Sequence, residues 1–318
     1  MPEQTLVSKV SSLLEIIDDE AVKILEKAEI GGEMDGLEPN EWLENRFKPN
    51  LVFIDEQDYA RMCVDALKIL SNTAATDYGS SRQRDMGQLW ADMTRSYLGE
   101  QAFVQFLKKN FDIPALLGHE RGEVADYLPM DISKIIKQGE EPREPKLKIG
   151  IKTTKWNGVW LDIPGSQFEH SDVHVLVKVG AARDHLFAFF KSLSVFKDKI
   201  LKKGQEVGVL TENEANILYD ELPSFKPVPA YICGFVRKSD AYSDLPYAGK
   251  KGRKNYTITS WNGQIKPGDL EKIIAVNDIK GSVKFEGIGD FAHDTGYLFN
   301  TGNLRWKKED WKNIANSI

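Results

Sequence analysis

Residues 146–164 read KLKIGIKTTKWNGVWLDIP, and the rest of the chain is interpreted around them. Apolar residues alternate with polar or small ones from position 147 to position 152, which is the period-two pattern of a half-buried β-strand. In that register Ile149 and Ile151 lie on one face and Lys152 lies on the other. A lysine on a packed strand is costly unless an anionic group meets it. The pattern therefore predicts a strand that carries Lys152 beside a carboxylate.

An earlier strand is predicted within residues 128–135, LPMDISKI. The polar segment between the two strands, residues 137–146 (KQGEEPREPK), is suited to fold back as a hairpin. A hairpin of this kind would bring Asp131 and Lys152 into one pocket. The alternative is that Lys152 is an ordinary strand lysine.

The composition is that of a folded chain. Its 318 residues suffice for one large domain or two moderate ones, and 41% of them are hydrophobic. No apolar run approaches the roughly 20 residues that span a bilayer, and the first residues show no secretory signal pattern. Cys63 and Cys233 are far apart, which indicates neither a disulfide framework nor a cysteine zinc site. A cytoplasmic location without membrane contact is expected.

Charge is distributed unevenly along the chain. The formal net charge is −6, and residues 1–50 alone carry twelve acidic and five basic side chains. The net charge argues weakly against a general binder of nucleic acid. Because the acidic excess is concentrated at the start, the remainder is free to form a local basic surface.

The predicted order of elements indicates an α/β fold with a central mixed β-sheet flanked by helices. Helical spacing of apolar residues predicts helices over 5–29, 55–70, 86–111 and 183–202. A further strand over 171–179 has valines on one face and a partly polar second face, as expected inside a sheet. We divide the chain into an N-terminal helical portion (1–85), an α/β core (86–204) and a C-terminal β-containing extension (205–318), which is either a separate segment or packed onto the core sheet.

Glu100 interrupts the apolar stripe of the helix predicted over 86–111. It follows Tyr97 by three positions and precedes Val104 by four, so it is expected on the core side. One interpretation is a boundary glutamate whose carboxylate reaches water. The other is a glutamate turned toward the sheet that carries Asp131 and Lys152.

The most basic stretch is YAGKKGRKNYTITSWNG, residues 247–263. It combines cations with aromatic and amide side chains, a mixture that can hold phosphates and reach a groove edge. The candidate DNA-binding residues there are Lys250, Lys251, Arg253, Lys254, Asn255 and Tyr256. Arg82 and Arg84 are a second, weaker candidate. The alternative in both places is a solvated loop without a partner.

The pattern MDISKI, a short polar hairpin, KIGIKTTK and then the strand SDVHVLVKV resembles the core of the PD-(D/E)xK nuclease superfamily, particularly type II restriction endonucleases. The resemblance covers about residues 86–200 and is made of short motifs. It implies a restriction-endonuclease-like fold and Mg²⁺-dependent hydrolysis of double-stranded DNA at a specific short sequence. It also implies a homodimer and a companion DNA methyltransferase in the cell.

The resemblance assigns roles to particular residues. Asp131 would bind the metal, Lys152 would lie beside the attacking water, and the backbone carbonyl of Ile151 would be a further metal ligand. Glu100 matches a glutamate that family members carry on the helix before the core sheet, as a catalytic and metal-binding residue.

One position departs from the family pattern. The residue two before the lysine should be acidic and is Gly150. Either another carboxylate has taken its place or the chain is an inactive relative. The candidates for a replacement are Asp162, Glu169 and Asp172 downstream and Glu100 upstream.

The chemistry of phosphodiester hydrolysis fits these residue types independently of the family name. Mg²⁺ is held in such sites by one or two carboxylates plus a carbonyl, and a partly desolvated lysine can orient water and stabilise negative charge. A zinc site of His170, His174 and His185 is not favoured, because the first two fall at a loop-to-strand junction. No nucleotide-binding or acyl-transfer motif is present. The alternatives to a restriction enzyme are a non-catalytic DNA-binding protein on the same scaffold and a structure-specific repair nuclease.

Overall fold

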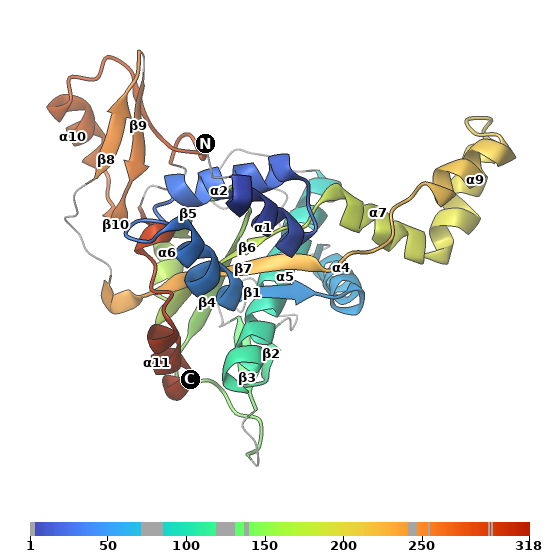
Figure 1. Cartoon of the computed structure of the whole chain (residues 1–318), viewed down its shortest axis with the longest axis horizontal. Coiled ribbons are helices and arrows are strands. Elements are labelled where there is room, and N and C mark those ends of the chain that lie inside the picture. Colours follow the sequence, from blue (N-terminus) through green and yellow to red (C-terminus); the bar gives the residue numbers. More distant parts are fainter. Residues whose placement is uncertain are drawn as a thin grey trace.

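The protein has a mixed α/β fold built on a four-stranded sheet (Figure 1). The computed structural model describes residues 4–70, 85–118, 131–136, 140–240, 247–253, 255–291, 293 and 295–318. The strand order is β1 (Leu51–Ile54), β7 (Val228–Arg237), β6 (Val173–Val179) and β4 (Ile149–Lys155). β4 and β6 are parallel, whereas β7 is antiparallel to both β6 and β1. The α/β class and the mixed central sheet expected from the sequence are therefore confirmed.

Strand β6 lies in the interior of the sheet with both faces covered. All seven of its residues are buried, including the polar side chains of His174 and Lys178. The partly polar second face predicted for this strand is therefore present, but it is covered by protein. The Lys178 ammonium forms an ion pair of 2.5 Å with the buried carboxylate of Glu33, which lies in the N-terminal segment. Because an unpaired buried charge is costly, this pair ties the N-terminal segment to the sheet.

One face of the sheet is covered by helices from three regions of the chain. These are α4 (Glu56–Leu70), α5 (Met86–Phe111), α7 (Arg183–Ser192) and α11 (Lys308–Ser317). The helices predicted over 55–70 and 86–111 are confirmed almost to the residue. α5 begins at a cap in which the Asp85 carboxylate accepts a hydrogen bond from the Gln88 amide, and it ends at Asp112 in a left-handed conformation.

The opposite face packs against the N-terminal helices and a second sheet. The single helix predicted over 5–29 is wrong: α1 (Gln4–Leu14) and α2 (Asp18–Ile30) are separated at Glu15, whose φ of 53° is left-handed. The short elements α3 (Pro39–Glu41), η1 (Trp42–Phe47) and η2 (Lys48–Asn50) follow. Apolar residues of α1, α2 and η1 share one core with residues of β6, β7 and the second sheet.

That second sheet joins the middle of the chain to its C-terminal part. Its order is β10 (Asn262–Ile265), β12 (Gly296–Asn300) and β5 (Trp160–Pro164), all antiparallel. A third sheet of β8 (Ala248–Lys251), β9 (Asn255–Ser260) and β11 (Ser282–Phe285), covered by α10 (Asp269–Val276), projects from the body at the upper left of Figure 1. β2 (Ala115–Leu117) and β3 (Ile132–Ile135) form a small pair. Other short helices are α6 (Gly165–Phe168), η5 (Lys238–Asp240) and η6 (Thr301–Asn303).

The helix predicted over 183–202 is interrupted. α7 ends at Ser192 because Leu193 is extended, with φ −90° and ψ 119°. η4 (Phe196–Leu201), α8 (Lys202–Glu206) and α9 (Glu212–Asp220) follow and project away from the body at the right of Figure 1. In the ranges that the structure describes, no helix is long and apolar enough to cross a membrane.

Candidate functional site

Lys152 lies in the middle of β4, at the edge of the central sheet. Alternate side chains of β4 point to opposite faces of the sheet. Ile149 and Ile151 pack in the core beneath α5, and Lys152 points to the other face. There its ammonium group donates a hydrogen bond to the Oε1 atom of Gln167, which lies on α6. The expected strand, including its two faces, is therefore present.

Asp131 lies immediately before β3 and against the outer edge of β4. Its carboxylate accepts a hydrogen bond from the backbone N–H of Ile151, and its own N–H donates to the carbonyl of Ile149 at 3.3 Å. No strand in the described ranges pairs with this edge of β4. Since the N–H and C=O of one strand residue point to the same edge, the Ile151 carbonyl faces the side on which the Asp131 carboxylate lies. The strand pairing implied by the expected hairpin is not present in the described ranges, because β3 pairs with β2 and not with β4. Arg143 of the expected hairpin segment forms a bridge with Ile135, while 128–130 and 137–139 lie outside the described residues.

Three carboxylates act on Lys152 from different elements. Burial lowers the pKa of Lys152, and the negative charges of Asp131, Asp162 and Glu100, in that order, oppose this shift. Glu100 is itself buried, with 6% of its surface exposed, on the face of α5 that packs on the sheet. The expectation that it lies on the core side is therefore confirmed. These negative charges come from α5, the start of β3 and β5, and the ammonium group on which they act is carried by β4.

The geometry around Gly150 explains why no acidic side chain stands there. A Cβ atom at position 150 would lie 2.8 Å from Oγ of Ser171 and 3.3 Å from Nδ1 of His174. Ser171 and His174 are both buried, so neither can move aside into solvent. A carboxylate at this position would therefore require rearrangement of the start of β6.

Of the three downstream candidates for a replacement carboxylate, Asp162 is the one whose negative charge opposes the lowering of the pKa of Lys152. Glu169 forms an ion pair of 2.5 Å with Lys238, and Asp172 accepts a hydrogen bond of 2.9 Å from the backbone N–H of Lys148. Asp162 lies on β5, in the second sheet.

His293 joins this group, and it was missed by sequence reasoning. Its Nε2 atom lies 3.4 Å from Oδ1 of Asp162, and the neighbouring carboxylate raises the pKa of the imidazole. Only the pairing of β5 with β12 brings the segment before β12 to Asp162, and no local spacing in the sequence signals such a contact.

The described histidines are not gathered into a metal site. Among the described residues no group of three or more His, Cys, Asp and Glu side chains is gathered closely enough to hold a metal ion. The Nε2 atom of His174 lies 3.1 Å from the Phe168 carbonyl, and burial lowers the pKa of His174 to about 4. His185 lies elsewhere, on α7, where its Nδ1 accepts a hydrogen bond from the N–H of Ala182.

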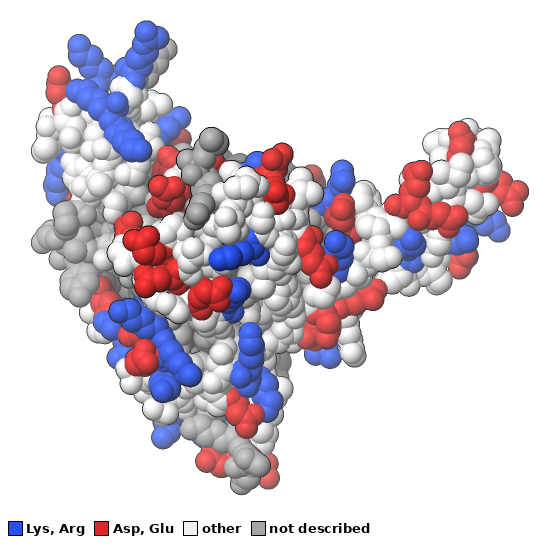
Figure 2. Space-filling view, in the orientation of Figure 1, with Lys and Arg blue, Asp and Glu red and all other residues white. Residues whose placement is uncertain are grey.

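The candidate DNA-binding residues fall on the projecting sheet. Lys250 and Lys251 are exposed at the end of β8, and Arg253 is exposed just after it. Figure 2 shows lysine and arginine side chains gathered at the upper end of this projection. Tyr256 is 8% exposed and packs in the small apolar core of this sheet, so its ring is a structural element there. Asn255 accepts a hydrogen bond of 3.1 Å from Ser282. Lys254, Arg82 and Arg84 lie outside the described residues.

The projecting sheet is fixed to the strand that carries Asp162. The indole N–H of Trp160, on β5, donates a hydrogen bond of 2.7 Å to the carbonyl of Glu286, just after β11. Trp160 also belongs to the same apolar cluster as Ile258 and Phe285 of the projecting sheet. The basic residues and Asp162 are therefore held by one continuous core.

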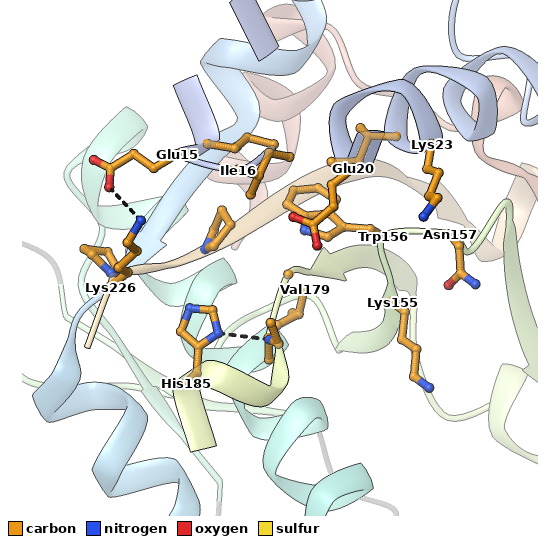
Figure 3. Close-up of a pocket in the computed structure, with 17 residues that line it drawn as sticks. Glu15, Ile16, Glu20, Lys23, Lys155, Trp156, Asn157, Val179, His185 and Lys226 are labelled. Atoms are coloured by element: carbon orange, nitrogen blue, oxygen red, sulfur yellow. Dashed lines mark hydrogen bonds and ion pairs between the residues drawn. The ribbon is translucent and has the colours of Figure 1, made fainter. Parts of the chain in front are cut away.

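A separate cavity of about 410 Å³ lies between α2, the turn after β4 and the start of α7 (Figure 3). Its walls are mostly apolar and include Trp156. Lys23 and Lys155 line it together with Glu20, so both signs of charge are present. Lys152 and the three carboxylates whose charges act on it are not among the residues that line this cavity.

Comparison of the chain with protein-family models, with curated proteins and with solved structures gives no match.

Proposed function

We propose that this protein is a Mg²⁺-dependent endonuclease that cuts double-stranded DNA at a specific short sequence, of the PD-(D/E)xK type represented by type II restriction endonucleases. The observation that carries the proposal is the contact of the Asp131 carboxylate with the amide of Ile151, at the edge of the strand whose next residue is Lys152. A restriction-endonuclease-like arrangement would require this combination of an acidic residue and a lysine on neighbouring segments.

The residues present suit a Mg²⁺ ion held by few protein ligands. Asp131 and the Ile151 carbonyl offer hard oxygen atoms at the same edge of β4, and Glu100 or Asp162 offers a second carboxylate. Because the described residues gather no three acidic or histidine ligands, at most two of these carboxylates would contact one ion. When bound, the ion would lower the pKa of a water molecule and stabilise charge on the phosphate.

The surroundings of Lys152 suit a lysine that interacts with a charged reactant. Its burial disfavours the ammonium form, while three carboxylates and the hydrogen bond to Gln167 retain and orient it. In this role the ammonium would hold the attacking water and stabilise negative charge on the phosphate. Gln167 would act as a positioning residue, because it contacts Lys152.

Asp162 is proposed to take the part of the acidic residue that Gly150 replaces. It is the downstream carboxylate that acts on Lys152, and its strand is fixed to the basic projecting sheet through Trp160. Lys250, Lys251 and Arg253 would contact DNA phosphates, since surface cations on a projection can reach a duplex. A homodimer and a companion DNA methyltransferase remain part of this proposal.

A second candidate function is favoured by Gly150. A protein that binds DNA on the same scaffold without cutting it would need no carboxylate at that position, and the crowding by Ser171 and His174 leaves no room for one. A structure-specific repair nuclease is the third possibility. It would cut branched or nicked DNA and leave intact duplex alone.

Plasmid DNA incubated with and without Mg²⁺ distinguishes these functions. We expect discrete fragments with Mg²⁺ from the wild-type protein, and cleavage at least about 100-fold slower from Asp131→Ala and from Asp162→Asn, with DNA binding retained. Glu169→Gln is the matched control, because Glu169 is an exposed carboxylate paired with Lys238, and it should cut within about threefold of wild type. Retardation of DNA without cutting would support the binding protein, and cutting by Asp131→Ala at the wild-type rate would refute the proposed site.

A further inference from the structure

Residues 193–222 form a helical arm that leaves the body after α7 and returns before β7. It contains η4, α8 and α9, and Figure 1 shows it extending away from the sheets. Contacts at its root hold it to α7: the Phe190 and Phe196 rings stack at 5.7 Å, and the Lys191 ammonium donates to the Leu222 carbonyl at 2.6 Å. The arm is therefore anchored at its base while its length lies outside the cores of the body.

The arm exposes far more apolar surface than it needs for its own packing. Leu201, Ala215 and Leu222 are its buried apolar residues. Six larger ones have between 41% and 73% of their surface exposed. They are Val195, Ile200, Val207, Val209, Ile217 and Leu218. Such a concentration of exposed apolar side chains on a projection is typical of an interaction surface.

The charges of the arm are divided between its two halves. The first half carries lysines at positions 197, 199, 202 and 203, with Asp198 as its acidic residue. The second half carries glutamate or aspartate at 206, 212, 214, 220 and 221 and no lysine or arginine. All arm residues are described, and the ion pair between its residues is Lys203 with Glu206 at 3.1 Å, three positions apart on α8. Figure 2 shows acidic side chains over α9 and lysines along the adjoining edge.

We propose that two copies of this protein pair through their arms. In a two-fold dimer each contact occurs twice, so the basic half of one arm would meet the acidic half of the other, and the reverse. The exposed valine, isoleucine and leucine side chains would be buried between these charged contacts. A surface that carries both members of a complementary pair is suited to a second copy of itself. The homodimer expected from the family resemblance specified no surface, and the arm provides one.

The mass of the full-length protein in solution, without DNA, tests the pairing independently of the proposed nuclease activity. Sedimentation equilibrium should give a dimer for the wild-type chain. Val209→Asp with Ile217→Asp should raise the dimer dissociation constant at least about tenfold. Val276→Asp is the matched control, because Val276 is 80% exposed on α10, outside the arm, and it should leave the mass unchanged. A monomeric wild-type protein, or an unaltered dimer in the arm variant, would overturn the proposal.

Charge reversal gives a sharper test that a folding defect cannot imitate. One variant carries Lys199→Glu and Lys202→Glu, and the other carries Glu212→Lys and Glu221→Lys. Each variant alone brings like charges together in a two-fold dimer and should be monomeric, whereas a 1:1 mixture restores both contacts and should be dimeric. Circular dichroism confirms that each variant is folded. Dimers formed by either variant alone, or a mixture that stays monomeric, would contradict pairing between the two halves.

Discussion

At the scale of single residues, the site depends on how β4 distributes its side chains. Lys152 is one residue beyond the amide that holds Asp131, and the alternation of the strand turns its side chain to the face opposite that of Ile151. This much follows from the sequence, because the period-two pattern fixes which residues share a face. That the charges of three carboxylates oppose the lowering of the pKa of Lys152 does not follow, because they come from separate elements.

The sequence shows that Gly150 stands where an acidic residue is expected, but it does not show why. The crowding comes from Ser171 and His174, whose approach depends on the parallel pairing of β4 with β6. The same pairing buries His174, whose Nδ1 atom has no hydrogen-bond partner among the described residues. A histidine held in this way resists protonation.

His174 should make the protein sensitive to mild acid. Its pKa is lowered from 6.5 to about 4 by burial, so the unfolded chain binds more protons between these values. Stability is therefore complete above pH 6.5 and is lost as the pH falls toward 4. At pH 4.5 this histidine should lower the free energy of unfolding by about 2–3 kcal/mol relative to pH 7.5.

The measurement is urea denaturation at both pH values. His174→Gln removes the titrating group and should lose that much less stability on acidification than the wild type does. The exposed His170→Gln is the control and should follow the wild type. An equal loss in the wild type and in His174→Gln would show that His174 contributes nothing to acid sensitivity.

At the scale of elements, the close approach of α5 to β4 brings Glu100 to the sheet. A Cβ atom at Gly99 would overlap Oγ1 of Thr153 and lie 2.9 Å from its Cβ. A glycine in the middle of a helix is otherwise unfavourable, so its presence here reflects this contact. The helix itself was predictable from its apolar spacing, but the partner of Gly99 was not.

Gly99→Ala should therefore destabilise the protein even though alanine favours helices. We expect a loss of about 1–3 kcal/mol in the free energy of unfolding from overpacking, measured by chemical denaturation. Gly87→Ala is the matched control on the same helix, because its Cβ would meet only the Asp85 carboxylate at 3.3 Å, and it should be neutral or gain up to about 1 kcal/mol. Thr153→Ala should restore part of the loss in the Gly99→Ala background. A Gly99→Ala protein as stable as the wild type would contradict the close packing.

Other elements show where local patterns fail. The break between α1 and α2 depends on the left-handed Glu15, and the end of α7 depends on the extended Leu193. Neither residue type is one that favours such a conformation, so the continuous apolar spacing on both sides gave no warning. The sequence predicted that these segments are helical, but it did not predict where each helix is interrupted.

At the scale of the whole molecule, the second sheet connects the proposed chemistry to the proposed DNA contacts. β5 carries Asp162 and pairs with β12, which brings in His293 and the basic projecting sheet. The pairing joins segments far apart in the chain, and no motif signals it. The sequence therefore predicted Asp131, Lys152 and Glu100 as candidates and left Asp162 as one of several options.

The cleavage rate of a lysine variant tests the proposed nuclease site most directly. Single-turnover cleavage of a duplex that carries the cut site would be compared for wild type, Lys152→Met and Lys148→Met. Lys148 is the matched control, because its exposed side chain lies just before the same strand and its hydrogen bonds with Asp172 are made by its backbone N–H and carbonyl. We predict that Lys152→Met cuts at least about 100-fold more slowly with DNA affinity unchanged, and that Lys148→Met stays within about threefold of wild type. Cleavage by Lys152→Met at the wild-type rate would contradict the proposed site.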